Sequence, residues 1–292
     1  MKTLTAWPRR LVACAAVALS HPAASQAQDA TAPAAAPAAS AAAPASPWSF
    51  NLTVASQYVS RGFSNSRGKP VLQGGVDYVH PSGFNAGFWM STLSDKFVQR
   101  GWAETDYYVG YTLAIGPVNV GAQLYYYDYP DGRFTYDGSV SAQSYDYGEI
   151  VPTFNYKGLT VKYWYTYTKD YFGVNDATMF TSGRGHSRGS GYLDVNASHD
   201  LGDGFALQGH FGHQKVAHFE RTNWSDAKIG VVKTFADGWS GTVAVTKAWS
   251  RKTEDLYGAG YTFDWTKYSV NPANATFDPI KTAVVFSVTK VF

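Results

Sequence analysis

The chain has 292 residues, its formal net charge is +2, and only 16% of its residues are charged, against roughly 25% in ordinary soluble proteins. Aromatic residues also make up 16%, with 21 Tyr, 9 Trp and 17 Phe. Beyond the N-terminal leader, no segment has the run of about 18 apolar residues that a membrane helix needs. These features leave two all-β alternatives: a membrane β-barrel with apolar residues at alternate positions, or a tyrosine-rich soluble β-sandwich.

The first 27 residues have the pattern of a secretory signal peptide. Lys2, Arg9 and Arg10 form a basic region, a short apolar stretch follows, and Ser25-Gln26-Ala27 fits a cleavage site. Removing these three basic residues leaves 21 basic residues against 22 acidic ones. A mature chain with this balance lacks the basic surface of a nucleic-acid-binding protein, so we expect no nucleic-acid partner.

Leu11-Val12-Ala13-Cys14 also matches a lipoprotein lipobox, which is the competing interpretation of this leader. A lipobox should follow the apolar stretch, whereas here a basic pair comes directly before it. Cys14 is the only cysteine. Its removal with the leader would exclude disulfides, cysteine nucleophiles and cysteine metal ligands.

Residues 28–47 consist almost entirely of Ala, Pro and Ser. Without large side chains this segment has no core to form, and its prolines interrupt a helix. We predict a disordered or extended linker that precedes a single β-barrel domain over residues 48–292.

From Trp48 the sequence alternates between apolar and polar residues in segments of about ten residues. For example, Tyr107, Val109 and Tyr111 occupy the odd positions of one segment, and Asp106 and Tyr108 occupy the even positions. We predict about twelve strands, over residues 48–60, 71–80, 84–94, 102–115, 118–129, 144–156, 159–172, 191–201, 205–216, 223–235, 239–250 and 279–292.

The connections between these strands alternate in length. Five are tight turns, at 81–83, 116–117, 157–158, 202–204 and 236–238, and six are longer, at 61–70, 95–101, 130–143, 173–190, 217–222 and 251–278. Short periplasmic turns and long extracellular loops are typical of an antiparallel up-and-down barrel in the bacterial outer membrane. An even number of strands places both termini on the periplasmic side. The aromatic C-terminus, Phe292, is typical of a closing strand read by the barrel-assembly machinery.

A resemblance to a known family lies between Asn51 and Ser94. It rests on three elements: Tyr58-Val59-Ser60-Arg61-Gly62, then Gly68-Lys69-Pro70-Val71-Leu72-Gln73-Gly74-Gly75, and the turn Ser82-Gly83-Phe84. This stretch resembles the TorF family, a proteobacterial family of outer-membrane barrels described as porins. The resemblance implies a barrel with a porin function and supplies no substrate.

Strand parity selects candidates for the lining of a pore. We expect inward-facing side chains at Asp77, Asp106, Glu149, Lys162, Asp194, Asp226 and Lys228, and we expect Arg61 at the mouth of the first loop. A lumen with charges of both signs orients polar solutes or closes itself with salt bridges. Twelve strands lie between filled eight-stranded barrels and open porins of about 16 strands, so an open pore would be narrow.

The sequence therefore favours a passive outer-membrane channel for small hydrophilic solutes, in contact with lipid and lipopolysaccharide and without a cofactor. The first alternative is a closed structural or surface-interaction barrel with binding loops at 173–190 and 251–278. The second is an outer-membrane hydrolase, although no motif brings a nucleophile, a base and an orienting group together. We predict that the protein is not an enzyme.

Two further motifs have simpler interpretations. His210 and His213 are three residues apart on a strand, so they point to opposite faces and we expect no shared metal ion. The run Gly183-Arg184-Gly185-His186-Ser187-Arg188-Gly189 has no helix after it and does not fit a phosphate-binding loop. We expect a mobile loop tip there, with contact to an anionic solute or lipopolysaccharide as the alternative.

Overall fold

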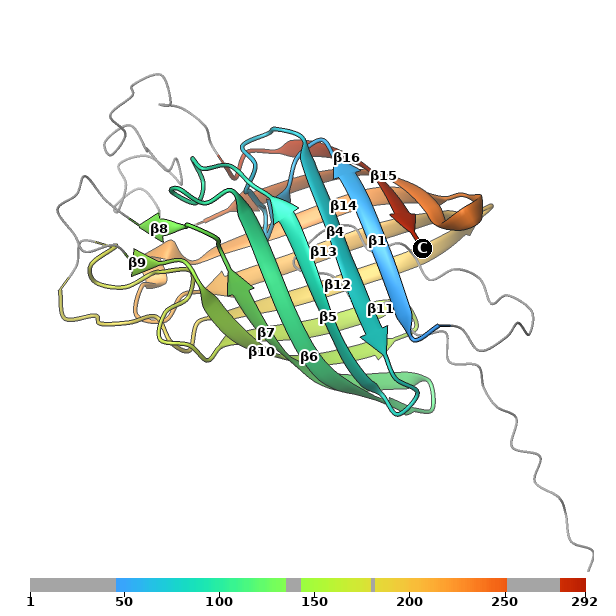
Figure 1. The fold of residues 1–292 in the computed structure, drawn as a ribbon, viewed down its shortest axis with the longest axis horizontal. Helices are drawn as coiled ribbons and strands as arrows, with labels where there is room; N and C mark the ends of the chain where they lie inside the picture. The colour runs from blue at the N-terminus through green and yellow to red at the C-terminus, as the bar shows by residue number, and fades with distance from the viewer. Residues whose placement is uncertain (1–45, 135–142, 180–181, 251–278) are drawn as a thin grey trace, which may run out of the picture.

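The computed structural model describes residues 46–134, 143–179, 182–250 and 279–292, and within them twelve strands form a closed antiparallel barrel (Figure 1). The predicted signal peptide, the lipobox, the linker up to residue 45 and the loop 251–278 lie outside the described residues. The barrel strands are β1 (Trp48–Ala55), β4 (Val71–Val79), β5 (Phe84–Thr92), β6 (Ala103–Ile115), β7 (Val118–Asp128), β10 (Tyr147–Tyr156), β11 (Leu159–Thr166), β12 (Gly191–Gly202), β13 (Phe205–Lys215), β14 (Trp224–Thr234), β15 (Trp239–Trp249) and β16 (Ala283–Val291).

Four two-residue strands lie in the described parts of the connections. They form two small hairpins, β2 (Val59–Ser60) with β3 (Phe63–Ser64) and β8 (Arg133–Phe134) with β9 (Gln143–Ser144). Two single-turn 3-10 helices, η1 (Glu220–Thr222) and η2 (Ala236–Gly238), also lie in connections. Among the described residues, no helix is long and apolar enough to cross a membrane.

The barrel is closed by pairing between its first and last strands. Asn51 to Ala55 of β1 face Val291 to Ser287 of β16 in antiparallel register. On the inner side, the Thr53 and Thr289 hydroxyls lie 2.8 Å apart, within hydrogen-bond distance. Every other barrel strand pairs with its neighbours along the chain. The predicted all-β, twelve-stranded, up-and-down architecture is therefore confirmed, and closure leaves no sheet edge with unpaired backbone groups.

Most predicted strand ends agree with the structure to within a few residues, with two larger differences. The first strand ends at Ala55 rather than residue 60, because the chain turns into the barrel there and forms the β2–β3 hairpin. The seventh ends at Thr166 rather than residue 172, where the chain enters a loop whose residues bond to one another. Alternating sequence patterns continue beyond both ends, so the pattern alone did not locate them.

The short connections and the described parts of the long connections lie at opposite ends of the barrel, as the sequence predicted. Figure 1 shows the β8–β9 hairpin at one end of the barrel and the C-terminus at the other. The turn between β10 and β11 illustrates the short kind: Lys157 and Gly158 have φ of 43° and 82°. Two consecutive positive φ values give the twist that joins adjacent antiparallel strands in a two-residue hairpin.

The two faces of the barrel differ in polarity. Side chains of one parity are large, apolar and exposed on the outside, including Leu52, Val109, Ile229, Val245 and Phe286. The other parity points inward and carries polar, charged and aromatic side chains that are largely buried. The inward positions on the strands therefore define the lumen wall.

Aromatic side chains and lysine stems gather on the outer face at the short-turn end. Trp48, Phe205 and Trp239 are exposed there. The Lys290 ammonium lies 5.5 Å from the centroid of the Trp239 ring and donates to the Asp237 carbonyl. The charged end of Lys290 thus reaches the rim of the barrel while its stem covers apolar surface.

Candidate functional site in the barrel lumen

The connection between β1 and β4 enters the barrel and fills part of its lumen. We call residues 56–70 the inner hairpin, and its tip, Arg61–Gly62, has φ of 46° and 79°. Residues 60 to 66 are all buried. Backbone hydrogen bonds from Ser64 to the Pro279 carbonyl and from Ser94 to the Asn65 carbonyl hold the hairpin to the segments just before β16 and just after β5.

Arg61 at the hairpin tip binds residues on the far wall. Its guanidinium donates to both carboxylate oxygens of Glu149 on β10, at 2.5 and 3.2 Å, and to the Gln214 side-chain oxygen on β13 at 2.7 Å. Arg61 is 2% exposed and Glu149 is 0% exposed. We expected Arg61 at the mouth of the loop. The structure instead places it inside the barrel, because the tight turn at Arg61–Gly62 directs it inward.

Aromatic rings surround the Arg61 guanidinium. Its central carbon lies 4.6 Å from the Tyr192 ring centroid, 5.4 Å from Trp164 and 5.6 Å from Tyr171. Burial alone lowers the pKa of Arg61, but Glu149 and the surrounding tyrosines raise it more, so that the net pKa lies well above its ordinary value. Arg61 therefore stays charged at any ordinary pH, and π faces and one carboxylate compensate that charge.

The inner hairpin also packs closely against β14 and β15. The Trp224 indole N–H donates to the Arg61 carbonyl at 2.8 Å. A Cβ placed on Gly62 would lie 2.5 Å from Asp226 Cβ and 2.6 Å from Ala248 Cβ. Glycine is required here both for the positive φ and for the space.

The base of the hairpin binds the wall near β6. The Tyr58 hydroxyl and the Asn65 amide donate to Glu104 Oε2, at 3.1 and 3.5 Å. The Tyr58 ring packs on Trp89 of β5 at 5.6 Å between centroids. Glu104 was not among the sequence candidates, although it has the same strand parity as Asp106 and parity alone would have selected it.

A second polar cluster lies on β12, β13 and β14. The His210 ring nitrogens lie 3.2 Å from Asp194 Oδ1 and 2.7 Å from Asp226 Oδ1, so this histidine bridges two predicted lining residues. The Tyr192 hydroxyl lies 3.0 Å from both His210 Nε2 and Asp226 Oδ2. His213 is exposed on the opposite face. Among the described residues, no group of three or more His, Cys, Asp or Glu is arranged to hold a metal ion.

The remaining candidates also have inward parity. Asp77 is buried and accepts a 2.5 Å hydrogen bond from the Tyr108 hydroxyl. Lys162 is half-buried beside its register partner Asp194, with its amine 5.4 Å from the Trp164 ring centroid. Lys228 is half-buried and pairs in register with His210. Asp106 is 0% exposed and lies beside Tyr127 of β7. That these side chains line a solute pathway stays a prediction.

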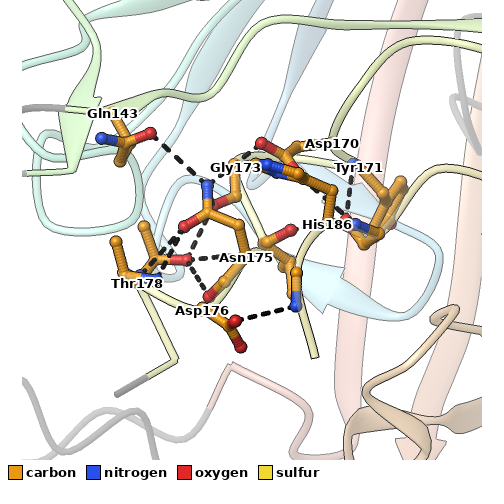
Figure 2. Close-up of polar contacts among 12 residues, drawn as sticks. Gln143, Asp170, Tyr171, Gly173, Asn175, Asp176, Thr178 and His186 are labelled. Atoms are coloured by element: carbon orange, nitrogen blue, oxygen red, sulfur yellow. Dashed lines mark hydrogen bonds and ion pairs between the residues drawn. The ribbon is translucent and has the colours of Figure 1, made fainter. Parts of the chain in front are cut away.

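The loop between β11 and β12 forms a separate polar cluster, shown in Figure 2. The Asn175 amide points toward Asp170 Oδ2, at 3.1 Å, and toward Gln143, and His186 Nδ1 lies 2.8 Å from Asp170 Oδ1. In the glycine-rich run 183–189, the backbone N–H groups of Arg184 and Gly185 donate to the Asp176 carboxylate. These two backbone N–H groups therefore already bind a carboxylate of the same chain. The predicted mobility of this run, and its contact with an external anion, stay predictions.

Several solved outer-membrane proteins are similar to this chain. The "KdgM porin" is 9% identical, with a TM-score of 0.46 over 84% of this chain and 98% of that one. The outer membrane protein OpdK from Pseudomonas aeruginosa is 11% identical, with a TM-score of 0.38 over 77% of this chain and 58% of that one. OccAB4 from Acinetobacter baumannii is 11% identical, with a TM-score of 0.36 over 81% of this chain and 56% of that one. At these identities and scores, the similarities say nothing about what this chain binds.

Sequence comparison gives a family. No curated protein matches the chain. A family model described as "Bacterial protein of unknown function (Gcw_chp)" matches residues 39–291, which include all of the barrel strands. The chain therefore belongs to the Gcw_chp family of bacterial proteins.

Proposed function

We propose that this protein is an outer-membrane channel that admits small hydrophilic solutes by passive diffusion, with the inner hairpin as its constriction. The observation that carries the proposal is the combination of an apolar outer wall with a charged inner wall, between whose strands the inner hairpin is folded. In hydrocarbon every backbone polar group needs a partner, and a closed barrel supplies one. This function agrees with the porin function that the TorF resemblance implies, and that finer family assignment stays a prediction.

The outer membrane is the location that fits this architecture. The apolar outer face with aromatic residues near the short-turn end matches the lipid-facing band and girdle of outer-membrane barrels. We propose that the short turns and both termini face the periplasm, that the outer face contacts lipid and lipopolysaccharide, and that the assembly machinery reads the strand ending at Phe292. We also propose that the protein is not an enzyme, because the inward Arg61, Glu149, His210, Asp194 and Asp226 side chains are engaged with one another in ion pairs and hydrogen bonds.

A closed barrel is the second candidate, and the inner hairpin is the observation that favours it. Residues 60 to 66 and the facing Glu149, Gln214 and Asp226 are all buried, so the hairpin and the wall fill the lumen where they meet. In such a barrel the long loops would carry the function through surface interactions. The two candidates differ in whether solute passes beside the hairpin.

Single-channel conductance in planar bilayers separates them. We expect small steps from the wild type and larger steps from Arg61→Ala, because the variant loses the contacts with Glu149 and Gln214 that hold the hairpin tip against the far wall. Arg133→Ala is the matched control, since Arg133 is exposed in the small β8–β9 hairpin and its loss should leave the steps unchanged.

Conductance steps seen only with Arg61→Ala would support a barrel closed by its hairpin. The absence of steps with all of these proteins would contradict the channel. A flux assay in liposomes with small acids, amides and sugars then identifies the class of solute.

A further inference from the structure

Four buried oxygen atoms on the inward face of β6 and β7 have no hydrogen-bond partner among the described residues. They are Glu104 Oε1, both carboxylate oxygens of Asp106, and the Tyr127 hydroxyl oxygen. Glu104 and Asp106 are two residues apart on β6, so they share its inward face. Asp106 and Tyr127 are directly paired in the register of β6 with β7. The four atoms therefore belong to one neighbourhood of the wall.

The chain compensates the charge in this neighbourhood only in part. The nearby cation is Arg61, whose guanidinium donates hydrogen bonds to Glu149 and Gln214. Glu104 receives two hydrogen bonds from the inner hairpin at Oε2 only. Within the described residues, neither Glu104 nor Asp106 forms an ion pair. Burying a carboxylate without a partner is strongly unfavourable, so a cation or a proton must neutralise the pair.

The surroundings favour a cation. Carboxylate and phenol oxygens are ligands for hard cations such as Na⁺, K⁺, Ca²⁺ and Mg²⁺. The Tyr127 ring stacks on the Tyr147 ring with 4.4 Å between centroids, and its centroid lies 6.0 Å from that of Tyr125. Aromatic faces therefore also border the site. Such rings attract ammonium groups through their π faces.

We propose that Glu104, Asp106 and Tyr127 bind one small cation, either a metal ion or the ammonium group of an amine, beneath the inner hairpin. Binding itself needs no open pore. If the cation also permeates, that consequence rests on the proposed channel function and makes the constriction selective for small cations.

Thermal unfolding of the purified barrel in detergent micelles tests the binding. The chloride salts of sodium, potassium, calcium, magnesium and methylammonium are compared with choline chloride at equal ionic strength and neutral pH. Choline is the reference because its three methyl groups leave no N–H donor and make it bulky. We expect at least one small cation to raise the unfolding midpoint saturably, since a ligand that binds only the folded state stabilises it. The cation that does so separates a metal site from an ammonium site.

Asp106→Asn should abolish this dependence or weaken the apparent affinity at least about tenfold, because it removes a charge-assisted contact. Asp203→Asn is the matched control, since Asp203 is exposed in a turn with a positive φ that Asn also tolerates, and it should behave like the wild type. If Asp106→Asn does not fold, Tyr127→Phe keeps the stacked ring and removes one oxygen ligand, and it should weaken the cation effect.

Equal midpoints in all salts for the wild type would overturn the proposal in favour of a shared proton. An unchanged cation effect in Asp106→Asn, or in Tyr127→Phe where that variant replaces it, would overturn it as well. Cation-dependent stability without conductance would leave the site intact and reject the channel. Conductance without cation-dependent stability would support the channel and reject the cation site.

Discussion

At the scale of single residues, many of the buried polar groups inside this barrel pair with one another. Arg61 and Glu149 form a bidentate ion pair with almost no solvent contact. Removing one member of such a pair lowers the free energy of unfolding by about 3–5 kcal/mol, because the other charge stays buried and uncompensated. The pair therefore fixes where the hairpin tip sits more than it raises net stability.

Gly62 allows a test of how tightly the tip is seated. Gly62→Ala should lower the free energy of unfolding by about 1–3 kcal/mol through backbone strain, and by more through the contacts with Asp226 and Ala248. Gly183→Ala is the matched control, because Gly183 has φ +76° against +79° for Gly62 and open space around its Cβ position. Urea unfolding in lipid vesicles measures both variants, and an equal loss would show that the tip is not packed against the wall.

At the scale of elements, each strand has one face for the outside and one for the lumen. On β15, Val245 points outward near the middle of the strand, between Ile229 of β14 and Val284 of β16. All three side chains are about half exposed on the outer wall. If this wall faces hydrocarbon, a charge at its centre should be far more costly than a charge at its rim.

Val245→Lys should therefore destabilise the barrel by about 2–4 kcal/mol in a lipid bilayer. Val118→Lys makes the same replacement on the outer parity beside the short turn at residues 116–117, where the cost should be about 0–1 kcal/mol because the amine reaches water. Reversible urea unfolding in phosphatidylcholine vesicles measures both. Equal effects of the two variants would argue against a membrane-spanning outer wall.

At the scale of the whole molecule, the lumen carries an excess of negative charge. The inward carboxylates named above are Asp77, Glu104, Asp106, Glu149, Asp194 and Asp226, whereas the inward cations named above are Arg61, Lys162 and Lys228. A pore lined with excess carboxylates attracts cations and repels anions. Exposed charges along such a pore are screened as the ionic strength rises.

We therefore expect the channel to prefer cations, as measured by the reversal potential in a gradient of potassium chloride. Asp194→Asn should shift this potential toward anions and Lys162→Gln toward cations, because these register partners carry opposite charges. Asp203→Asn, in an exposed turn, should leave it unchanged. Shifts of the same sign from Asp194→Asn and Lys162→Gln would contradict a pathway past this pair.

The inward parity of the candidate residues could be predicted from the sequence because side chains alternate strictly along a strand. Asp77, Asp106, Glu149 and Asp194 all follow this rule, and Glu104 would have followed it too. What could not be predicted is which of them meet. The Arg61–Glu149 pair joins residues 88 positions apart, and no local pattern encodes the direction in which a connection folds at the end of a strand.

By itself, the sequence determined the strand number, the sorting of short and long connections, and the two faces of the wall. Each of these follows from local periodicity and turn chemistry. Only the tertiary structure decided that the first connection folds inward and that Arg61 reaches the far wall. It also decided that the Asp106 carboxylate and the Tyr127 hydroxyl remain buried without hydrogen-bond partners. The physical reason is that barrel closure brings distant strands around one small volume, where charge and space must be balanced among residues far apart in the chain.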